Sequence, residues 1–364
     1  MQRALILNAG SSSLKWSLLA AATGEVEAQG EEPWKGGEAA ARAALQSLAR
    51  FPAPDAIGHR LVHGGSRFRR AVLLDPATRK ALAGLAEIDP LHTGPALELI
   101  DAAGDAFPHL PQVAAFDTTF HATLPPAAAT YALPYEWTRS WELRRYGFHG
   151  LSVAYAVRRS GEILGEIPGR LVVCHLGSGC SVTAVQEGRS FDTTMGFTPL
   201  EGVMMGTRSG SIDPGLLLYL QRQHGLDAAG LEAALSQSSG LLGVSGISGD
   251  LRQVLQAADS GNDRARLAYE MFLHSLQRAV GAMAGVLGGV DALVFTGGIG
   301  ERSARVREAL AGCLAFAGLE LDREENERAR PDSRISTAGS TVVALVIAAR
   351  EDLSVLDELR CLLG

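Results

Sequence analysis

The chain contains the same short pattern twice, once near its start and once near its middle. Residues 4–18 read ALILNAGSSSLKWSL and residues 171–185 read LVVCHLGSGCSVTAV. Each copy has an apolar run, a turn of small residues and a second alternating run, and a third possible strand follows in GEVEAQG and GRSFDTT. Such runs, bounded by turn residues, are typical of β-strands. The repeat predicts a duplicated fold in which two similar domains hold a ligand between them.

Strand-like and helix-like stretches alternate along the sequence. The periodicity predicts strands at 4–8, 14–20, 56–63, 112–117, 170–176, 180–186, 291–296 and 341–347. It predicts helices at 77–86, 95–104, 151–164, 214–222, 264–287, 303–316 and 351–362. This alternation indicates an α/β architecture with largely buried sheets. The length of 364 residues suggests two domains, and we expect them at 1–150 with a return of 351–364, and at 151–350.

The composition argues against several classes of partner. A net charge of −7 disfavours nucleic acid and anionic membranes. No apolar run approaches the ~20 residues that span a bilayer. The four cysteines show no CxxC spacing, which argues against a zinc site or a disulfide framework. The N-terminus passes directly into a predicted strand without a signal-like segment. We therefore expect a cytoplasmic protein.

Three glycine-containing turns follow predicted strands. They lie in NAGSSS, in HLGSGCS and in FTGGIGERS, where we expect a loop at the glycines and a helix that starts near Ser303. Glycine lets the backbone approach a phosphate group closely, and a helix N-terminus favours negative charge. The sequence has no Gly-Lys dipeptide for a P-loop, no GxGxxG and no GxSxG. The turns therefore predict a phosphate site of a strand–turn–strand type.

Seven longer segments resemble the signature segments of the acetate kinase family, in the family's order. They are NAGSSSLKW (8–16), GHRLVHGG (58–65), FDTTFHATLP (116–125), RRYGFHGLS (144–152), HLGSGCS (175–181), DTTMGFTPLEGVMMGTRSG (192–210) and FTGGIGERS (295–303). The resemblance implies the duplicated sugar-kinase/Hsp70/actin-type α/β fold, with an active-site cleft between an acyl/phosphoryl-side domain and a nucleotide-binding domain. It implies reversible, direct in-line transfer of the ATP γ-phosphoryl to acetate or propionate, giving an acyl phosphate and ADP. It also implies Mg²⁺ or Mn²⁺ as cofactor and a homodimer.

The resemblance further implies a role for individual residues. Forked arginine donors suit carboxylate and phosphoryl oxygens, and the implied catalytic residues are Arg60, Asp117, His149 and Arg208. Asn8 and Glu351 would hold the metal together with Asp117. The implied acyl pocket comprises Val62, Leu91, Phe148 and Pro199 beside Arg60, with His92 as a structural neighbour. Ser11, Ser13 and Lys15 would line the phosphate path. The nucleotide would contact Ser13, Lys15, His175, Leu176, Gly177, Ser178, Gly179, Asp250, Leu251, Arg252, Gly298, Ile299, Gly300, Glu301 and Arg302.

The sequence departs from the family pattern mainly on the nucleotide side. Ser178 and Arg302 each stand where the family usually has asparagine, and Ser211 stands where it usually has aspartate. A family member with a different phosphoryl donor therefore stays an alternative. So do an ATP-binding clamp without acyl transfer and another phosphotransferase of the same fold, such as a sugar kinase that uses an aspartate base. The two arginines and His149 favour a carboxylate acceptor, which is already ionised at neutral pH.

Overall fold

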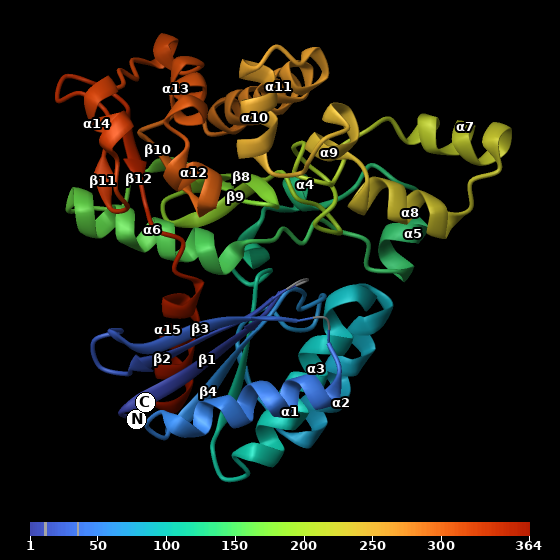
Figure 1. Cartoon of the computed structure of the whole chain (residues 1–364), viewed down its shortest axis with the longest axis vertical. Helices are drawn as coiled ribbons and strands as arrows, with labels where there is room; N and C mark the ends of the chain where they lie inside the picture. Colours follow the sequence, from blue (N-terminus) through green and yellow to red (C-terminus); the bar gives the residue numbers. More distant parts are fainter. Residues whose placement is uncertain (11–12, 35) are drawn as a thin grey trace. The chain divides into compact units, whose positions relative to one another are not determined.

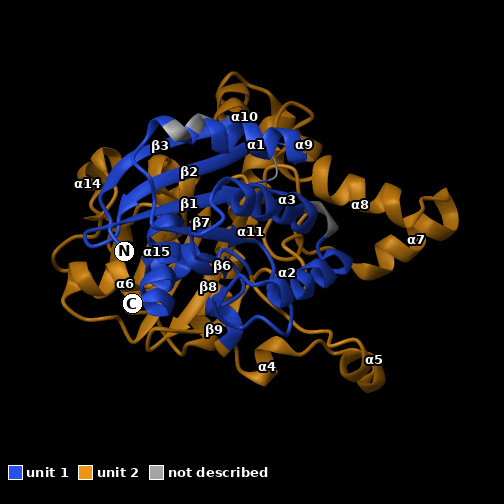
Figure 2. Ribbon diagram, turned by 90° about the horizontal axis from the view of Figure 1, so that it is seen from below, with its two compact units in different colours: residues 1–122, 148–155, 350–364 blue, residues 123–147, 156–349 orange. Residues whose placement is uncertain are grey.

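The computed structural model describes residues 1–10, 13–34 and 36–364, with the backbone alone at Ser47, Ala49, Pro90 and Leu91. The chain forms two compact units (Figure 2). Unit 1 comprises residues 1–122, 148–155 and 350–364, and unit 2 comprises residues 123–147 and 156–349. The C-terminal segment thus returns to the unit that the N-terminus begins.

Within the described residues, each unit contains one six-stranded mixed sheet (Figure 1). The strands of unit 1 are β1 (Arg3–Ala9), β2 (Ser13–Ala20), β3 (Val26–Pro33), β4 (Ala56–Leu61), β5 (Val72–Leu73) and β6 (Gln112–Phe116). Those of unit 2 are β7 (Arg170–Leu176), β8 (Cys180–Gln186), β9 (Arg189–Thr193), β10 (Ala292–Thr296), β11 (Ser333–Arg334) and β12 (Val343–Val346). The strand orders are β3-β2-β1-β4-β6-β5 and β9-β8-β7-β10-β12-β11.

The two sheets have the same topology, strand for strand. β1 pairs antiparallel with β2 and parallel with β4, and β7 pairs in the same way with β8 and β10. The parallel pairs β4–β6 and β10–β12 and the antiparallel edge strands β5 and β11 also correspond. The duplicated α/β fold that the sequence predicted is confirmed.

Every predicted helix is present. Unit 1 contains α1 (Glu38–Ser47), α2 (Pro76–Ala83), α3 (Pro90–Ala106) and α15 (Glu351–Leu363). Unit 2 contains α4 (Pro126–Ala129), α5 (Tyr135–Ser140), α7 (Pro214–His224), α8 (Ala228–Gln237), α9 (Gly240–Ser245), α10 (Leu251–Asp259), α11 (Asp263–Val286), α12 (Gly297–Arg302), α13 (Ala304–Gly312) and α14 (Arg323–Arg328), while α6 (Gly150–Leu164) has residues in both units. None of the helices in the described part of the chain combines the length and the apolar composition that a membrane crossing needs.

The prediction for the third glycine turn was wrong in one respect. The glycines do not form a loop: α12 begins at Gly297, and Ser303 ends α12 and caps α13 by accepting a hydrogen bond from Val306 N–H at 3.4 Å. Gly297 has a φ of 77°, and a Cβ there would lie 2.7 Å from the Leu176 carbonyl oxygen. Glycine is therefore required where the chain leaves β10 and passes close to β7.

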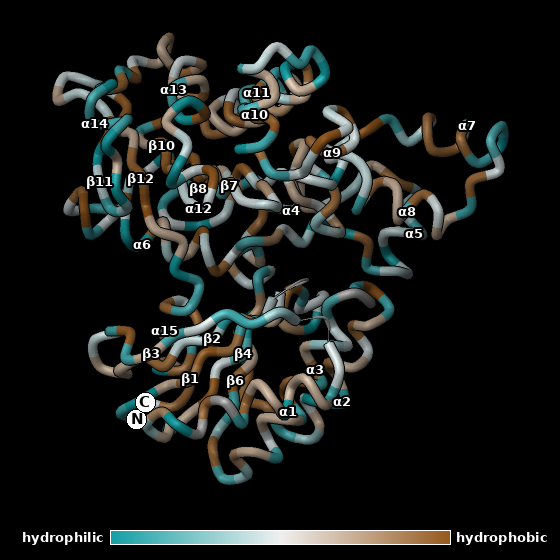
Figure 3. The backbone as a smooth tube through the Cα atoms, in the orientation of Figure 1, coloured by the Kyte–Doolittle hydropathy of each residue, from teal (hydrophilic) through white to brown (hydrophobic). Residues whose placement is uncertain are grey.

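Different helices cover the two faces of the unit 1 sheet, whose central strands are largely hydrophobic (Figure 3). On one face, Leu5 and Leu7 pack in a core with side chains of α1 and α3. On the other face, Ile6 packs with Val355 and Leu359 of α15. Successive side chains of a strand alternate between faces. Asn8, two residues after Ile6, therefore lies on the α15 face.

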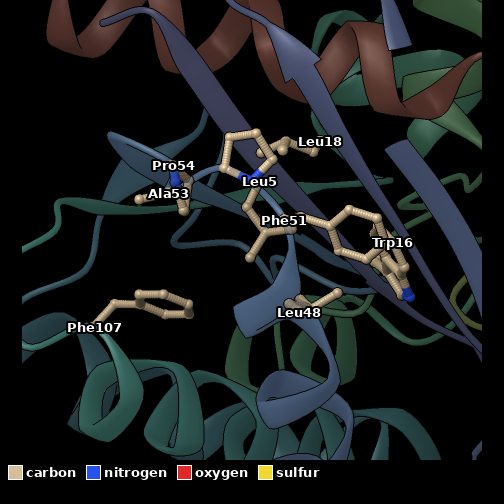
Figure 4. A pocket seen from close by; sticks show the side chains of 9 residues that line it. Leu5, Trp16, Leu18, Leu48, Phe51, Ala53, Pro54 and Phe107 are labelled. Atoms are coloured by element: carbon tan, nitrogen blue, oxygen red, sulfur yellow. The ribbon is translucent and has the colours of Figure 1, made fainter. Parts of the chain in front are cut away.

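A cavity of about 220 Å³ lies on the α1/α3 face of unit 1 (Figure 4). Its lining is apolar and consists of Leu5, Trp16, Leu18, Leu48, Phe51, Pro52, Ala53, Pro54 and Phe107. Because these strand residues face away from Asn8, the cavity is separate from the predicted active-site residues.

Candidate active site

Three of the predicted residues lie in one row across the unit 1 sheet. Asn8 of β1 pairs with Lys15 of β2 on one side and with Arg60 of β4 on the other. Directly paired residues project from the same face of a sheet. Lys15 is exposed, and its Nζ lies 4.0 Å from Glu31 at the outer strand. The row therefore runs from an exposed lysine to a largely buried arginine.

The Arg60 guanidinium is held on one edge by Asp117, which directly follows β6. Nε donates to Asp117 Oδ1 at 3.1 Å, and Nη2 donates to Oδ2 of the same carboxylate. Nη1 makes a longer contact, 3.4 Å, with Asn8 Oδ1. A guanidinium has five N–H donors. Among the described residues these contacts use three, which leaves one N–H on each terminal nitrogen for two further oxygens.

Several carboxylates surround Arg60. Asp117 is 1% exposed, and burial raises its pKa, whereas the Arg60 charge opposes that rise. Repulsion from Glu351 raises the pKa of Asp117 further. Glu351 is the first residue of α15, and its Oε2 accepts a hydrogen bond from Asn8 Nδ2 at 2.9 Å. The structure thus brings the predicted residues Asn8, Arg60, Asp117 and Glu351 together.

This group of oxygen atoms fits a hard divalent cation. Mg²⁺ prefers carboxylate and amide oxygens and keeps several of its waters. Two carboxylates and one amide oxygen are present, and a cation would relieve the repulsion between Asp117 and Glu351. The described residues contain no cluster of three or more His, Cys, Asp or Glu side chains suited to a metal.

His149 is placed beside Asp117 by its backbone neighbours. Gly150 N–H donates to the Asp117 carbonyl oxygen at 2.8 Å, and a Cβ at Gly150 would lie 2.1 Å from that oxygen. On the other side, His121 Nε2–H donates to the Phe148 carbonyl oxygen at 2.9 Å. His149 itself has a φ of 59°, a conformation that is uncommon for residues other than glycine. The hydrogen bonds on both sides hold it there.

The predicted acyl-pocket residues are distributed over both units. In unit 1, Phe148 is buried and its ring packs edge-on against His63, 5.3 Å between centroids, next to Val62 in the sequence. The side chain of Leu91 lies outside the described residues, as does the whole of Ser11. Pro199 belongs to unit 2.

Sequence analysis missed three residues that organise this region. His63 and His121 hold the Phe148 loop, and Asp89 accepts a hydrogen bond from His92 Nδ1 at 2.7 Å. His63 and His121 lie inside the segments GHRLVHGG and FDTTFHATLP, so their position in these segments was the available signal. Nothing in the sequence marked Asp89.

Two buried histidines are expected to make unit 1 less stable in acid. Burial lowers the pKa of His59 to about 4, although its Nε2–H donates to Gln112 Oε1 at 2.6 Å, and burial lowers that of His121 to about 4. The unfolded chain therefore binds more protons than the folded one between pH 6.5 and 4. The free energy of unfolding should fall by about 3 kcal/mol per histidine across that window.

His59→Gln tests this prediction. Denaturant unfolding at pH 7, 5.5 and 4 should show that the variant loses less stability on acidification than the wild type, by about 3 kcal/mol. Equal losses for the two proteins would contradict a neutral buried His59.

In unit 2, Arg208 connects two predicted sites. Its Nη1 donates to the Pro199 carbonyl oxygen at 3.1 Å. Two residues earlier, Gly206 N–H donates to the Ser178 carbonyl oxygen at 3.2 Å. The turn that carries Arg208 is therefore fixed to Pro199 of the predicted acyl pocket and to Ser178 of a predicted nucleotide segment.

The three predicted nucleotide segments meet at the carboxyl ends of β7 and β10. Residues 175 and 176 form the last pairs of β7 and residues 177–179 follow them, while α12 follows the neighbouring strand β10. A Cβ at Gly206 would lie 2.9 Å from the carbonyl oxygen of Gly249, which precedes Asp250. The segments 175–179, 250–252 and 298–302 are thus neighbours, as a common ligand requires.

The side chains in these segments differ in their exposure to solvent. Ser178 is exposed, and the Arg252 side chain is 85% exposed and paired with Asp250 at 2.6 Å. Leu176 and Leu251 are buried in the core. These two leucines can therefore offer only backbone groups to a nucleotide.

Arg307 of α13 is a buried charge that sequence analysis missed. It is 2% exposed, and it donates to the carbonyl oxygens of Gly300 and Glu301 at 3.0 and 2.9 Å. It also donates to Asn326 Oδ1 at 2.8 Å and to the Asn326 carbonyl oxygen at 2.5 Å. Arg307 therefore ties the end of α12, which carries a predicted nucleotide segment, to α14.

The chain is similar to known proteins in both sequence and fold. A sequence model of the Acetokinase family matches residues 47–357. The acetate kinase of Nostoc sp. is 47% identical over 319 residues, which cover 87% of this chain and 78% of that protein. The crystal structure of Porphyromonas gingivalis acetate kinase superposes with a TM-score of 0.91 at 35% identity, covering 100% of both chains. A propionate kinase from Francisella tularensis superposes with a TM-score of 0.91 at 36% identity, covering 98% of this chain and 99% of that one. This chain belongs to the Acetokinase family.

Proposed function

We propose that this protein is a kinase that transfers the γ-phosphoryl group of ATP to acetate, giving acetyl phosphate and ADP. Besides family membership, one observation carries the proposal. Arg60 is fixed by Asp117 through Nε and Nη2, and besides its contact to Asn8 each terminal nitrogen keeps one further N–H. Two parallel N–H groups match the two oxygens of a carboxylate.

The same contact disfavours a sugar kinase. Such an enzyme needs an aspartate base for the acceptor hydroxyl, whereas Asp117 is paired with the Arg60 guanidinium, which stabilises the ionised carboxylate and makes it a weaker base. A carboxylate acceptor needs no base because it is ionised at neutral pH.

The other site residues complete the proposed mechanism. Arg60 binds and orients the acid, and Arg208 and His149 neutralise charge on the phosphoryl group in transit, because such transfers depend mainly on positioning and electrostatics. Asn8, Asp117 and Glu351 would hold Mg²⁺ or Mn²⁺, which when bound supplies positive charge to the phosphates. Unit 1 takes the acyl/phosphoryl side of the reaction. Unit 2 takes the nucleotide side through residues 175–179, 250–252 and 298–302.

The acyl chain is proposed to contact Val62, Leu91, Phe148 and Pro199. One additional methylene in an apolar pocket changes binding by only about 1–3 kcal/mol. We therefore propose propionate as a second, weaker substrate.

The direct test is a panel of C1–C4 carboxylates with ATP and Mg²⁺, in which hydroxylamine traps the acyl phosphate. We expect acyl hydroxamate with acetate, and less with propionate. Phosphorylation of a sugar, or ATP hydrolysis without any hydroxamate, would overturn the proposal.

Ser178→Asn should raise kcat with ATP and acetate by ~10-fold, and it should leave KM for acetate unchanged. Ser178 has its backbone fixed by Gly206 and its side chain exposed, so a longer amide donor could reach a phosphate there. Steady-state kinetics with ATP, GTP and pyrophosphate measure the effect. A lower kcat for the variant with all three donors would instead indicate that Ser178 and Arg302 form a site adapted to another donor.

We also propose a cytoplasmic homodimer. Unit 2 exposes Tyr135, Trp137 and Trp141 in and after α5, and Leu218 and Tyr219 on α7. Exposed apolar groups of this size mark interaction surfaces, and closed symmetric dimers are the commonest assemblies. The four free thiols fit a reducing compartment. Light scattering should give a mass of two chains for the wild type. The double variant Trp137→Glu/Leu218→Glu should give the mass of one chain.

A further inference from the structure

An arginine clamp in unit 2 holds the loop that carries Pro199. The clamp consists of Tyr131, Arg145 and Glu201, and the loop comprises residues 193–201. Arg145 Nη1 lies within hydrogen-bond distance of three successive carbonyl oxygens, 3.2, 3.1 and 3.1 Å from those of Thr193, Thr194 and Met195. Arg145 Nη2 donates to Glu201 Oε1 at 2.7 Å. One side chain thus fixes both ends of the loop.

Tyr131 completes the clamp in the middle of the loop. Its hydroxyl donates to Glu201 Oε2 at 2.5 Å and accepts a hydrogen bond from Phe197 N–H at 2.7 Å. The loop closes tightly on these groups, since a Cβ at Gly196 would lie 1.6 Å from Glu201 Oε2 and 2.2 Å from the Tyr131 hydroxyl oxygen. Both oxygens of Glu201 are therefore used to set the loop geometry.

The loop is joined to both predicted catalytic segments. The Gly196 carbonyl oxygen accepts hydrogen bonds from Tyr146 N–H at 3.0 Å and Gly147 N–H at 3.2 Å, just before His149 in the chain. The Pro199 carbonyl oxygen accepts the hydrogen bond from Arg208 Nη1. The direction in which the Arg208 guanidinium points therefore depends on where the clamp holds Pro199.

We propose that Tyr131, Arg145 and Glu201 are positioning residues that orient Arg208 for phosphoryl transfer. The proposal rests on the role assigned to Arg208 under the proposed function. Arginine has a long side chain with considerable rotamer freedom. A fixed carbonyl acceptor restricts the Arg208 side chain before the substrates bind, so less conformational entropy is lost in the transition state. A charge-neutralising group contributes most when it is already in place as the charge develops.

Glu201→Gln and Tyr131→Phe are the test variants. The first removes the charge that holds Arg145, and the second removes one hydroxyl but keeps the Arg145–Glu201 pair. Each should lower kcat by ~10-fold or more, while KM for ATP stays within about 2-fold. Asp332→Asn is the matched control, because Asp332 forms an ion pair with Arg159 in the same unit that is buried to a similar extent. Its kcat should equal that of the wild type.

A double-mutant cycle separates positioning from mere structural support. In an Arg208→Ala background, Glu201→Gln and Tyr131→Phe should have little further effect on kcat, because the group that they orient is gone. Additive losses in that background, or unchanged kcat in both single variants, would overturn the inference. Wild-type kcat for Arg208→Ala alone would overturn the proposed role of Arg208 itself. If Glu201→Gln unfolds the protein, the double-mutant cycle of Tyr131→Phe with Arg208→Ala alone tests whether the clamp orients Arg208.

Discussion

Arg60→Ala is expected to lower kcat for acetyl phosphate formation by ~10²-fold or more. The Arg60 guanidinium is the forked donor in unit 1 that is held beside Asn8, Asp117 and Glu351. Under the proposed mechanism, its replacement removes both the contact to the acid and positive charge close to the transferred group. Arg60→Lys should lose less, because it keeps the charge but not the two-point geometry.

Stability must be measured together with the kinetics of these variants. Without Arg60, the buried carboxylate of Asp117 loses its counter-charge, which typically costs about 3–5 kcal/mol. Arg60→Ala/Asp117→Asn removes that penalty and should stay folded but inactive.

Arg79→Ala is the control for Arg60. Arg79 makes the same two-point contact with Asp101, at 2.7 and 2.6 Å, on the surface of unit 1. The kcat of Arg79→Ala should stay within about 2-fold of the wild-type value, because exposed ion pairs contribute little to stability. A folded Arg60→Ala protein with wild-type kcat and only a raised KM for acetate would contradict a role in the transition state.

Arg307→Met is expected to reduce the free energy of unfolding by about 3–5 kcal/mol. The methionine fills much of the same volume but cannot donate to the four acceptors that Arg307 satisfies. The carbonyl oxygens of Gly300 and Glu301 at the end of α12 then lose their partner. We also expect KM for ATP to rise, because α12 carries residues 298–302.

Denaturant unfolding of Arg307→Met and Arg305→Ala measures this effect with a control from the same helix. Arg305 lies two residues earlier on α13, is half-exposed and pairs with Asp259 at 2.9 Å. Arg305→Ala should lower the free energy of unfolding by less than about 1 kcal/mol. Similar losses of stability for the two variants would show that the buried network of Arg307 contributes no more than a surface pair.

The sequence alone determined the duplication and the positions of its strands, except the two-residue edge strands β5 and β11. The alternation of Ile6 and Asn8 with Leu5 and Leu7 also specifies which side chains share a face, because the period of a strand is two residues. These properties depend on neighbours in the chain, so they can be predicted without knowledge of the packing.

Helices that owe their stability to packing could not be predicted. α9 contains Gly240 and Gly243, and α12 contains Gly297, Gly298 and Gly300. Glycine is a poor helix former. These short helices form because the surrounding strands and loops approach them closely, as at Gly240, where a Cβ would lie 2.2 Å from the Met205 carbonyl oxygen.

Only the tertiary structure decided which polar groups meet. Arg60 and Asp117 are 57 residues apart, and Asn8 and Glu351 are 343 residues apart. Arg307 was indistinguishable from a surface arginine in SARVREAL, yet it is buried against Asn326. A buried charge must find its hydrogen-bond partners where the packed strands and helices place them. That placement depends on contacts between distant segments, which no local pattern in the chain specifies.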